Sequence, residues 1–343
     1  MNAVSSNLSV HDVLRHLHNM YGVFNDVKDL GAVDLYVYFS RMEKDYVFEG
    51  KRNYAMTVHQ LSPLSFQKDK RKIALLKGKT DIAISDRMIC PYCSSRLPPK
   101  DGYLLHIKQS NVCCDKCREV ITYEAFVLAT FVWNFNRGDY AAVKVKGFLG
   151  VLLTFDKSNA TWKAFSSYLL QLLKTNENIL AMPSTEQRKE SFNLRKEIRG
   201  HIAAVRNNIS SLSFDLIQGL YRQLSFINKI CGNYICCNYE YWTNPKIIEE
   251  SIKRYFKFLN LIAVHQRRRK ILVPTMDIDL IWHTHQCLSD SSDSYCNYTR
   301  TLMGRILNHD DTIESDGLKK GRYRRSLLLV PSSSYHHLII IFF

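Results

Sequence analysis

The sequence has no long run of apolar residues. Its longest apolar stretches, Gly147–Phe155 and Leu338–Phe343, are far shorter than the roughly 18 residues that a membrane-spanning helix needs. Residues Met1–Val10 are polar and lack the basic-then-apolar pattern of a secretory signal. We therefore expect no membrane span and a location in the cytoplasm or the nucleus.

Acidic residues are also in short supply. The 343 residues include 47 Lys and Arg but only 32 Asp and Glu, which gives a formal net charge of +15. This excess suits an acidic partner such as nucleic acid or an anionic membrane, but it does not identify one. The densest basic runs, Lys68–Lys72 and Arg267–Lys270, are interpreted as solvated turns; contact with nucleic-acid phosphates and a nuclear-import signal are the alternatives.

Strand-like alternation of apolar and polar residues is scarce as well. Apolar residues instead recur every three or four positions, often just after a residue that favours a helix start. Ser9, Ser213 and Thr275 are predicted caps, and Pro245 is a predicted first helical residue. The predicted fold is mainly α, a multi-helix domain with a small zinc-ribbon-like module inserted.

We divide the chain into four parts. Residues 1–80 form a helical segment, 81–150 a zinc-binding module with a flanking helix, and 151–320 a helical domain. The basic segment Lys68–Lys79 is interpreted as a connection, and Pro98-Pro99 as a break in regular structure. Residues 321–343 form an atypical tail that we expect to pack poorly; the alternative is a strand that completes the core.

Ten cysteines without a secretory signal indicate free thiols or metal ligands rather than disulfides. Two C-x-x-C turns, at Cys90 and Cys93 and at Cys114 and Cys117, can place four sulfurs around one zinc ion. Such a closed site has no open coordination position, so the predicted zinc is structural. Four buried, unpaired cysteines and a redox C-x-x-C pair are the alternatives. Cys113, next to Cys114, is a fifth thiol near the site. His106 could replace one of the four cysteines as a ligand.

The most distinctive segment is Val273–Gln286, which reads VPTMDIDLIWHTHQ, and Asn308–Asp311 follows it. The polar and metal-ligating residues of these two segments are Asp277, Asp279, Trp282, His283, His285, Gln286, His309, Asp310 and Asp311. On a helix, positions i and i+2 point about 200° apart, so His283 and His285 cannot easily share one ion. Helical spacing puts Trp282 and His285 on a buried apolar face instead.

Three interpretations of this segment stay open. The first is a structural polar network, and the second is a metal or catalytic site, for which two histidines and a carboxylate could hold iron or zinc. The third is a partner-binding site. No glycine-rich phosphate loop, G-x-S-x-G elbow or H-E-x-x-H motif occurs in the chain, so the sequence predicts no reaction.

These motifs resemble the glycine-rich domain-containing protein-like family of fungi and plants. Val273–Gln286 matches the family's V-P-T-x-D-x-D-L-x-W-H-T-H-Q segment, and Gly304–Asp311 matches its G-x-x-x-x-H-D-D segment. Phe214–Lys229 is similar to its F-x-L-D-L…R-Q-x-x-F-I-x-K stretch. In fungal members a C-P-x-C…C-x-x-C module precedes these segments, as Cys90–Cys117 does here.

The resemblance implies an intracellular helical protein stabilised by zinc, which we expect to be a non-enzymatic interaction or regulatory protein with a protein partner. The family's glycine-rich tail has no counterpart among the 14 glycines here, and the RNA-recognition domain of some members is not visible. A metal-dependent, oxygenase-like enzyme that uses residues 282–285 and 309–311 is one alternative function. A nucleic-acid-binding protein is the other.

Overall fold

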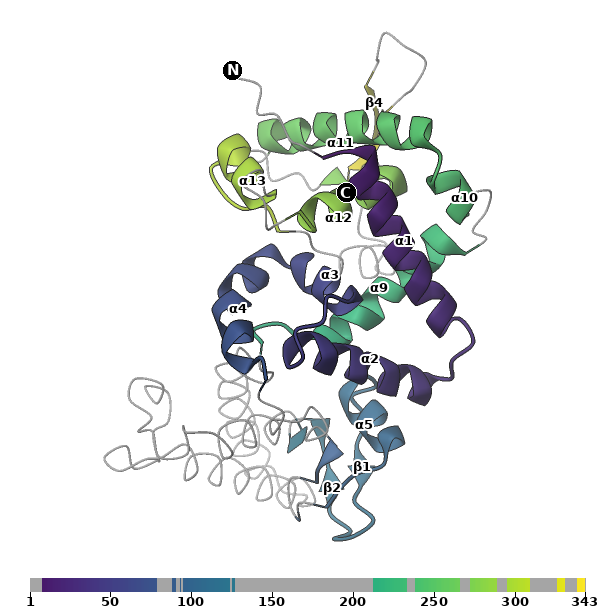
Figure 1. Ribbon diagram of the computed structural model, residues 1–343, viewed down its shortest axis with the longest axis vertical. Helices are drawn as coiled ribbons and strands as arrows, with labels where there is room; N and C mark the ends of the chain where they lie inside the picture. Colours follow the sequence, from purple (N-terminus) through teal and green to yellow (C-terminus); the bar gives the residue numbers. More distant parts are fainter. Residues whose placement is uncertain are drawn as a thin grey trace, which may run out of the picture. The chain divides into compact units, whose positions relative to one another are not determined.

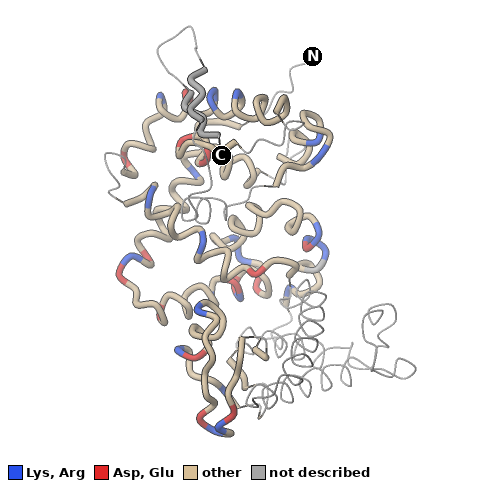
Figure 2. The backbone as a smooth tube through the Cα atoms, turned by 180° about the vertical axis from the view of Figure 1, so that it is seen from behind, with Lys and Arg blue, Asp and Glu red and all other residues tan. Residues whose placement is uncertain are grey.

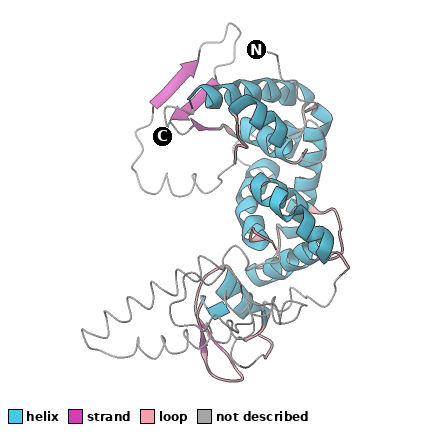
Figure 3. Ribbon diagram, turned by 90° about the vertical axis from the view of Figure 1, so that its left-hand side faces the viewer, coloured by secondary structure: helices cyan, strands magenta, loops and turns pink. Residues whose placement is uncertain are grey.

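The computed structural model describes residues 8–78, 88–90, 93, 95–123, 125–126, 212–232, 238–265, 272–288 and 295–308, and the backbone of 326–330 and 338–342. This part of the chain is mostly helical with a few short strands (Figures 1 and 3), which confirms the predicted fold class. It falls into two compact units. The first holds residues Met1–Asp29, Tyr54–Gln67 and Gly219–Phe343, and the second holds Leu30–Asn53 and Lys68–Gln218.

Helix α1 (Val10–Val27) belongs to the first unit and begins as its sequence predicts. The hydroxyl of Ser9 accepts the backbone N–H of Asp12, and the carboxylate of Asp12 accepts the backbone N–H of Ser9. This reciprocal capping box satisfies two backbone donors that the first turn leaves open. The apolar side of α1, with Leu17 and Met20 fully buried, faces the core.

Helix α12 (Met276–Gln286) is covered from several sides within the first unit. It contacts α1, α11 (Pro245–His265) and α13 (Tyr295–Met303). Every residue from Ile278 to Gln286 is therefore buried, and not only the one apolar face that helical spacing predicted. The shorter helices of this unit are α3 (Tyr54–Gln60) and α10 (Tyr239–Trp242).

Two helix starts in the first unit differ in how they are capped. Helix α11 begins at Pro245, as predicted, and the side-chain oxygen of Asn244 accepts the N–H of Lys246 at 3.0 Å. Thr275 precedes α12, but its hydroxyl does not cap the helix. It donates to the carboxylate of Asp277 at 2.6 Å. Thr275 therefore occupies the predicted cap position, but its side chain makes no capping hydrogen bond.

Helix α4 (Pro63–Leu76) corrects the interpretation of Lys68–Lys79 as a connection. Its basic residues obscured one buried carboxylate, that of Asp69, on the inner side of the helix. Asp69 accepts hydrogen bonds from the backbone N–H and the hydroxyl of Ser213, at 2.7 and 2.8 Å. Ser213 is thereby held against α4. The prediction that Ser213 caps α9 (Leu216–Cys231) is therefore wrong.

The second unit also contains α2 (Ala32–Val47) and the cysteine-rich module. Inside the module, α5 (Pro99–His106) starts where Pro98-Pro99 was interpreted as a break. Proline is tolerated in the first helical turn because its missing N–H would have no partner there. Strands β1 (Val112–Cys113) and β2 (Val120–Ile121) follow as an antiparallel pair.

Three short strands form a separate antiparallel sheet in the order β3-β5-β4. They are β3 (Leu272–Val273), β4 (Ser326–Val330) and β5 (Leu338–Phe342). Strand β5 pairs with β4 at five positions and with β3 at two. The side chains of β4 and β5 lie outside the described residues, so the expected poor packing of the tail stays a prediction.

Charges of both signs are spread over the described helices (Figure 2). The basic run Arg267–Lys270 lies outside the described residues. None of the helices in the described ranges is both long enough and apolar enough to span a bilayer.

Candidate functional site

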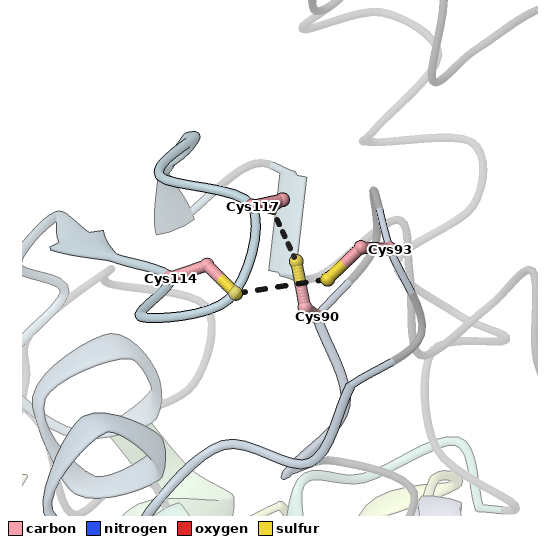
Figure 4. A group of neighbouring side chains, drawn as sticks. All are labelled: Cys90, Cys93, Cys114 and Cys117. Atoms are coloured by element: carbon pink, nitrogen blue, oxygen red, sulfur yellow. Dashed lines mark hydrogen bonds between the residues drawn. The ribbon is translucent and has the colours of Figure 1, made fainter.

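Four cysteine side chains point toward one another in the second unit (Figure 4). Cys114 and Cys117 come from the turn between β1 and β2, while Cys90 and Cys93 come from the segment before α5. The sulfurs of Cys90 and Cys117 lie 3.7 Å apart, as do those of Cys93 and Cys114. All four ligand atoms lie within 4.8 Å of one another.

This spacing fits a tetrahedral metal ion. Zinc lies about 2.3 Å from each thiolate, which places the four sulfurs of a regular tetrahedron about 3.8 Å apart. The Cys90–Cys117 and Cys93–Cys114 separations, both 3.7 Å, are close to that value. Within the described residues, no other group of three or more Cys, His, Asp or Glu side chains is close enough to hold a metal ion. The four cysteines can therefore hold one.

Ser95 belongs to the site, although no sequence pattern had pointed to it. Its hydroxyl lies 3.0 Å from the sulfur of Cys93 and 3.4 Å from that of Cys114. The hydrogen bond from Ser95 lowers the pKa of the Cys93 thiol. Burial alone would raise the pKa of Cys114, but hydrogen bonds from Ser95 and from the backbone of Cys117 and Lys116 outweigh it and lower that pKa to about 6. The thiolate is the metal-binding form, so these contacts favour a cation at this position.

Neither the substitute ligand, His106, nor the spare thiol, Cys113, takes part in the cluster. His106 has both ring nitrogens engaged elsewhere: Nδ1 lies 3.2 Å from the hydroxyl of Tyr36, and Nε2 lies 2.8 Å from the carboxylate of Asp215. Cys113 is exposed, and its thiol lies 3.5 Å from the carbonyl oxygen of Arg118. The four predicted cysteines thus form the cluster without a histidine.

His285 occupies a buried position on α12, as helical spacing predicted. Its side chain has no exposed surface, and its Nδ1 lies 2.8 Å from the hydroxyl of Tyr255. The rings of Tyr295 and Tyr298 lie 5.3 and 5.4 Å from the imidazole, centroid to centroid. Burial lowers the pKa of His285 to about 4, so the side chain is neutral at pH 7. It is a core histidine with a hydrogen-bond partner.

His283 has a different set of neighbours from His285. Its ring packs against Phe226 at 4.4 Å between centroids, and its Nε2 lies 3.7 Å from the carboxylate of Asp279. The two histidines therefore do not share a site, which agrees with their spacing on the helix. Asp277 forms an ion pair with Arg254 at 3.2 Å and lies at the start of α12.

Trp282 and Gln286 also make contacts within the protein. The indole N–H of Trp282 donates to the hydroxyl of Tyr295 at 2.9 Å, and this hydroxyl donates to the carbonyl of Leu307 at 2.8 Å. The side-chain N–H of Gln286 donates to the carbonyl of Leu61 at 3.3 Å. The described half of the motif is thus a packed polar network inside the core.

His16 is a buried histidine that was not singled out from the sequence. His16 on α1 lies beside α12, with Nδ1 3.9 Å from the sulfur of Cys287. Burial, helped by the nearby His283, lowers the pKa of His16 to about 3. The signal that could have found it is its spacing, because His16 lies three positions after Val13 and four before Met20 on the buried side of α1.

The second half of the motif, His309, Asp310 and Asp311, lies outside the described residues. The hypothesis of a second metal site that combines these residues with α12 is therefore not tested by the structure. What the described residues of α12 contribute is packing and hydrogen bonding.

A family model matches the part of the chain that contains α12. Residues 173–297 match the family described as glycine-rich domain-containing protein-like. Glycine-rich domain-containing proteins 2 and 1 of Arabidopsis thaliana are 37% and 34% identical to this chain over 109 residues. The aligned region covers 31% of this chain but only 12% of either relative. No solved structure matches the chain.

The region matched to the glycine-rich domain-containing protein-like family includes helices α9 to α12. The four cysteines precede it, and His309–Asp311 follow it. The comparisons therefore support the resemblance found around Trp282, and they do not bear on the cysteine module.

Proposed function

We propose that this chain is a fungal-type member of the glycine-rich domain-containing protein-like family, in which a structural zinc ion stabilises a helical interaction protein. The protein would act in the cytoplasm or nucleus by binding a protein partner. The match over residues 173–297 supports the family. The convergence of four cysteine sulfurs at tetrahedral spacing is the observation that carries the role of zinc.

The residues that would hold the zinc ion are Cys90, Cys93, Cys114 and Cys117. When bound, zinc cross-links the two C-x-x-C turns, which are too small to build an apolar core of their own. Four protein ligands fill the tetrahedral shell, so no position is left for a substrate or a reactive water. The site is therefore suited to structure and not to catalysis.

The environment of α12 also favours a non-enzymatic protein. His283 is 1% exposed and His285 is 0% exposed, so neither imidazole can meet a substrate without a change of structure. Catalytic groups act in concave sites that substrates can enter. The described histidines of this helix are instead packed against aromatic rings.

Metal analysis of the purified protein tests this proposal directly. We expect one zinc per chain in the wild type, and no zinc after Cys90→Ser or Cys117→Ser, because each substitution removes a ligand. Cys113→Ser is the matched control, since this exposed thiol lies outside the cluster, and it should keep full zinc occupancy.

Full zinc occupancy in a Cys90→Ser, Cys117→Ser double variant would rule out the structural site. A second metal ion that disappears with His283→Gln would favour the enzyme alternative. Retention of RNA that weakens steeply as salt rises would favour the nucleic-acid alternative.

A further inference from the structure

Helix α5 links the cysteine module to the rest of the second unit. Gly102 allows close contact, because a Cβ atom at this position would lie 3.2 Å from a ring carbon of Tyr36 on α2. At the end of α5, the ring of His106 packs edge-on against Tyr36 and lies 5.7 Å from the ring of Phe126. His106 is buried there, and its contact with Tyr36 is made away from water, whereas the side chain of Asp215 is 37% exposed.

His106 connects this helix to the start of α9. Its Nε2 lies 2.8 Å from one carboxylate oxygen of Asp215, while the other oxygen of Asp215 accepts the backbone N–H of Gln218 at 3.1 Å. The side chain of Gln218 in turn donates to the backbone carbonyl of His106 at 3.4 Å. Asp215 is thus the N-terminal cap of α9, and His106 fixes the orientation of its carboxylate.

The position of α5 depends on the two cysteine turns. Cys93 lies shortly before the helix and Cys114 shortly after it, so a metal bound to both closes α5 into a loop. Closing a loop reduces the conformations open to the segment within it. Without the metal, the chain on both sides of α5 loses this cross-link, and His106 loses the constraint that holds it against Asp215.

We propose that metal occupancy of the four-cysteine site controls the N-terminal cap of α9 through His106. This inference rests on the proposed zinc site but makes a separate claim. Helix α9 lies within the residues matched to the family. Zinc therefore acts on the first turn of α9 by way of α5, His106 and Asp215, and loss of zinc frees the cap.

Amide hydrogen exchange of the full chain, with and without a strong zinc chelator, tests the coupling. The amide of Gln218 reports on the cap, and zinc content is measured on the same samples. We expect chelation to speed exchange of the Gln218 amide about fivefold to tenfold, as the loss of a cap does. Two other side-chain-capped amides, Tyr241 on α10 and Lys246 on α11, serve as internal controls and should not change.

The variant His106→Phe separates the coupling from metal binding. Phenylalanine keeps a ring between Tyr36 and Phe126 but cannot bond to Asp215. We expect this variant to bind zinc normally, to show fast exchange at Gln218 with zinc present, and to show no further change on chelation. If His106→Phe lowered zinc content, the substitution would have disturbed the metal site itself, and the claim that His106 acts only on the cap would fail.

The two proposals fail in different ways. Zinc present in the wild type together with unchanged exchange at Gln218 after chelation would overturn the coupling alone. Equal acceleration at Gln218, Tyr241 and Lys246 would also overturn it, because zinc would then hold the whole fold and not this cap. A protein that binds no zinc would overturn both the metal site and the coupling.

Discussion

At the scale of single residues, polar groups buried beside aromatic rings define the core of the first unit. Trp282 donates to Tyr295, Tyr255 bonds to His285, and His16 lies against Cys287. A buried polar group without its partner costs stability, so these pairs restrict how α12 can be placed. Their function is to fix the position of a helix that is covered on all sides.

Trp282→Ala should lower the free energy of unfolding by about 3–5 kcal/mol, as large-to-small core substitutions do. The side chain is 5% exposed and packs against Phe258 at 5.7 Å between ring centroids. Trp282→Phe should cost less, because it keeps one ring in the core and loses the donor to Tyr295 and part of the indole packing. Urea unfolding measures both values.

The control for this measurement is Tyr241→Ala, an aromatic truncation at a side chain that is 41% exposed. We expect it to change stability by no more than about 0.5 kcal/mol. An unchanged unfolding midpoint in Trp282→Ala would contradict the burial of this residue.

At the scale of elements, local sequence signals predicted where helices begin better than they predicted which distant residues contact each other. The capping box at Ser9 and the proline start of α11 depend only on neighbouring residues, so they were readable in advance. Asp69 holding Ser213 and His106 holding Asp215 join residues that are distant in the sequence. No rule based on sequence spacing finds such pairs. The Lys and Arg residues around Asp69 had indicated a solvent-exposed connection.

The tail strands offer a prediction at this scale. Deletion of residues 321–343 should leave the melting temperature unchanged, because β4 and β5 pair mainly with each other and β5 meets β3 at only two positions. Thermal unfolding followed by circular dichroism measures this. A clear loss of stability would mean that the tail strands complete the core, and our interpretation of the tail would be wrong.

At the scale of the whole molecule, the sequence predicted a mainly helical protein with a four-cysteine group, because periodicity and C-x-x-C spacing are local patterns. It placed His285 correctly, since an apolar stripe on a helix implies a buried side. It did not find Ser95, which approaches two sulfurs only after both turns have folded, or His16, a polar residue in an otherwise apolar stripe.

Global stability should fall as the pH is lowered below about 6.5. The pKa of His16 is lowered to about 3 and that of His285 to about 4, from 6.5 in the unfolded chain. Above pH 6.5 both histidines are neutral in the folded and in the unfolded state, so their contribution to the free energy of unfolding is fully present. Between pH 6.5 and about 4 the unfolded state binds protons that the folded state does not, so each histidine removes up to about 1.4 kcal/mol per pH unit.

Urea unfolding at a series of pH values measures this slope. His16→Gln should flatten it by removing one of the two titrating groups, although the variant is less stable near pH 7.5. His18→Gln, at an exposed position on the same helix, should keep the slope of the wild type. Equal slopes in all three proteins would show that the buried histidines are not responsible.

The alternation of the chain between its two units has a consequence for biosynthesis. Helix α1 packs against α11 and α12, whose residues follow it by more than two hundred positions. A ribosome delivers the chain from its N-terminus, so the apolar side of α1 meets α3 early but lacks α11 and α12 until most of the protein has been made. The second unit, whose segments end at Gln218, can fold earlier. During translation, the apolar side of α1 is therefore only partly covered while the second unit can already fold.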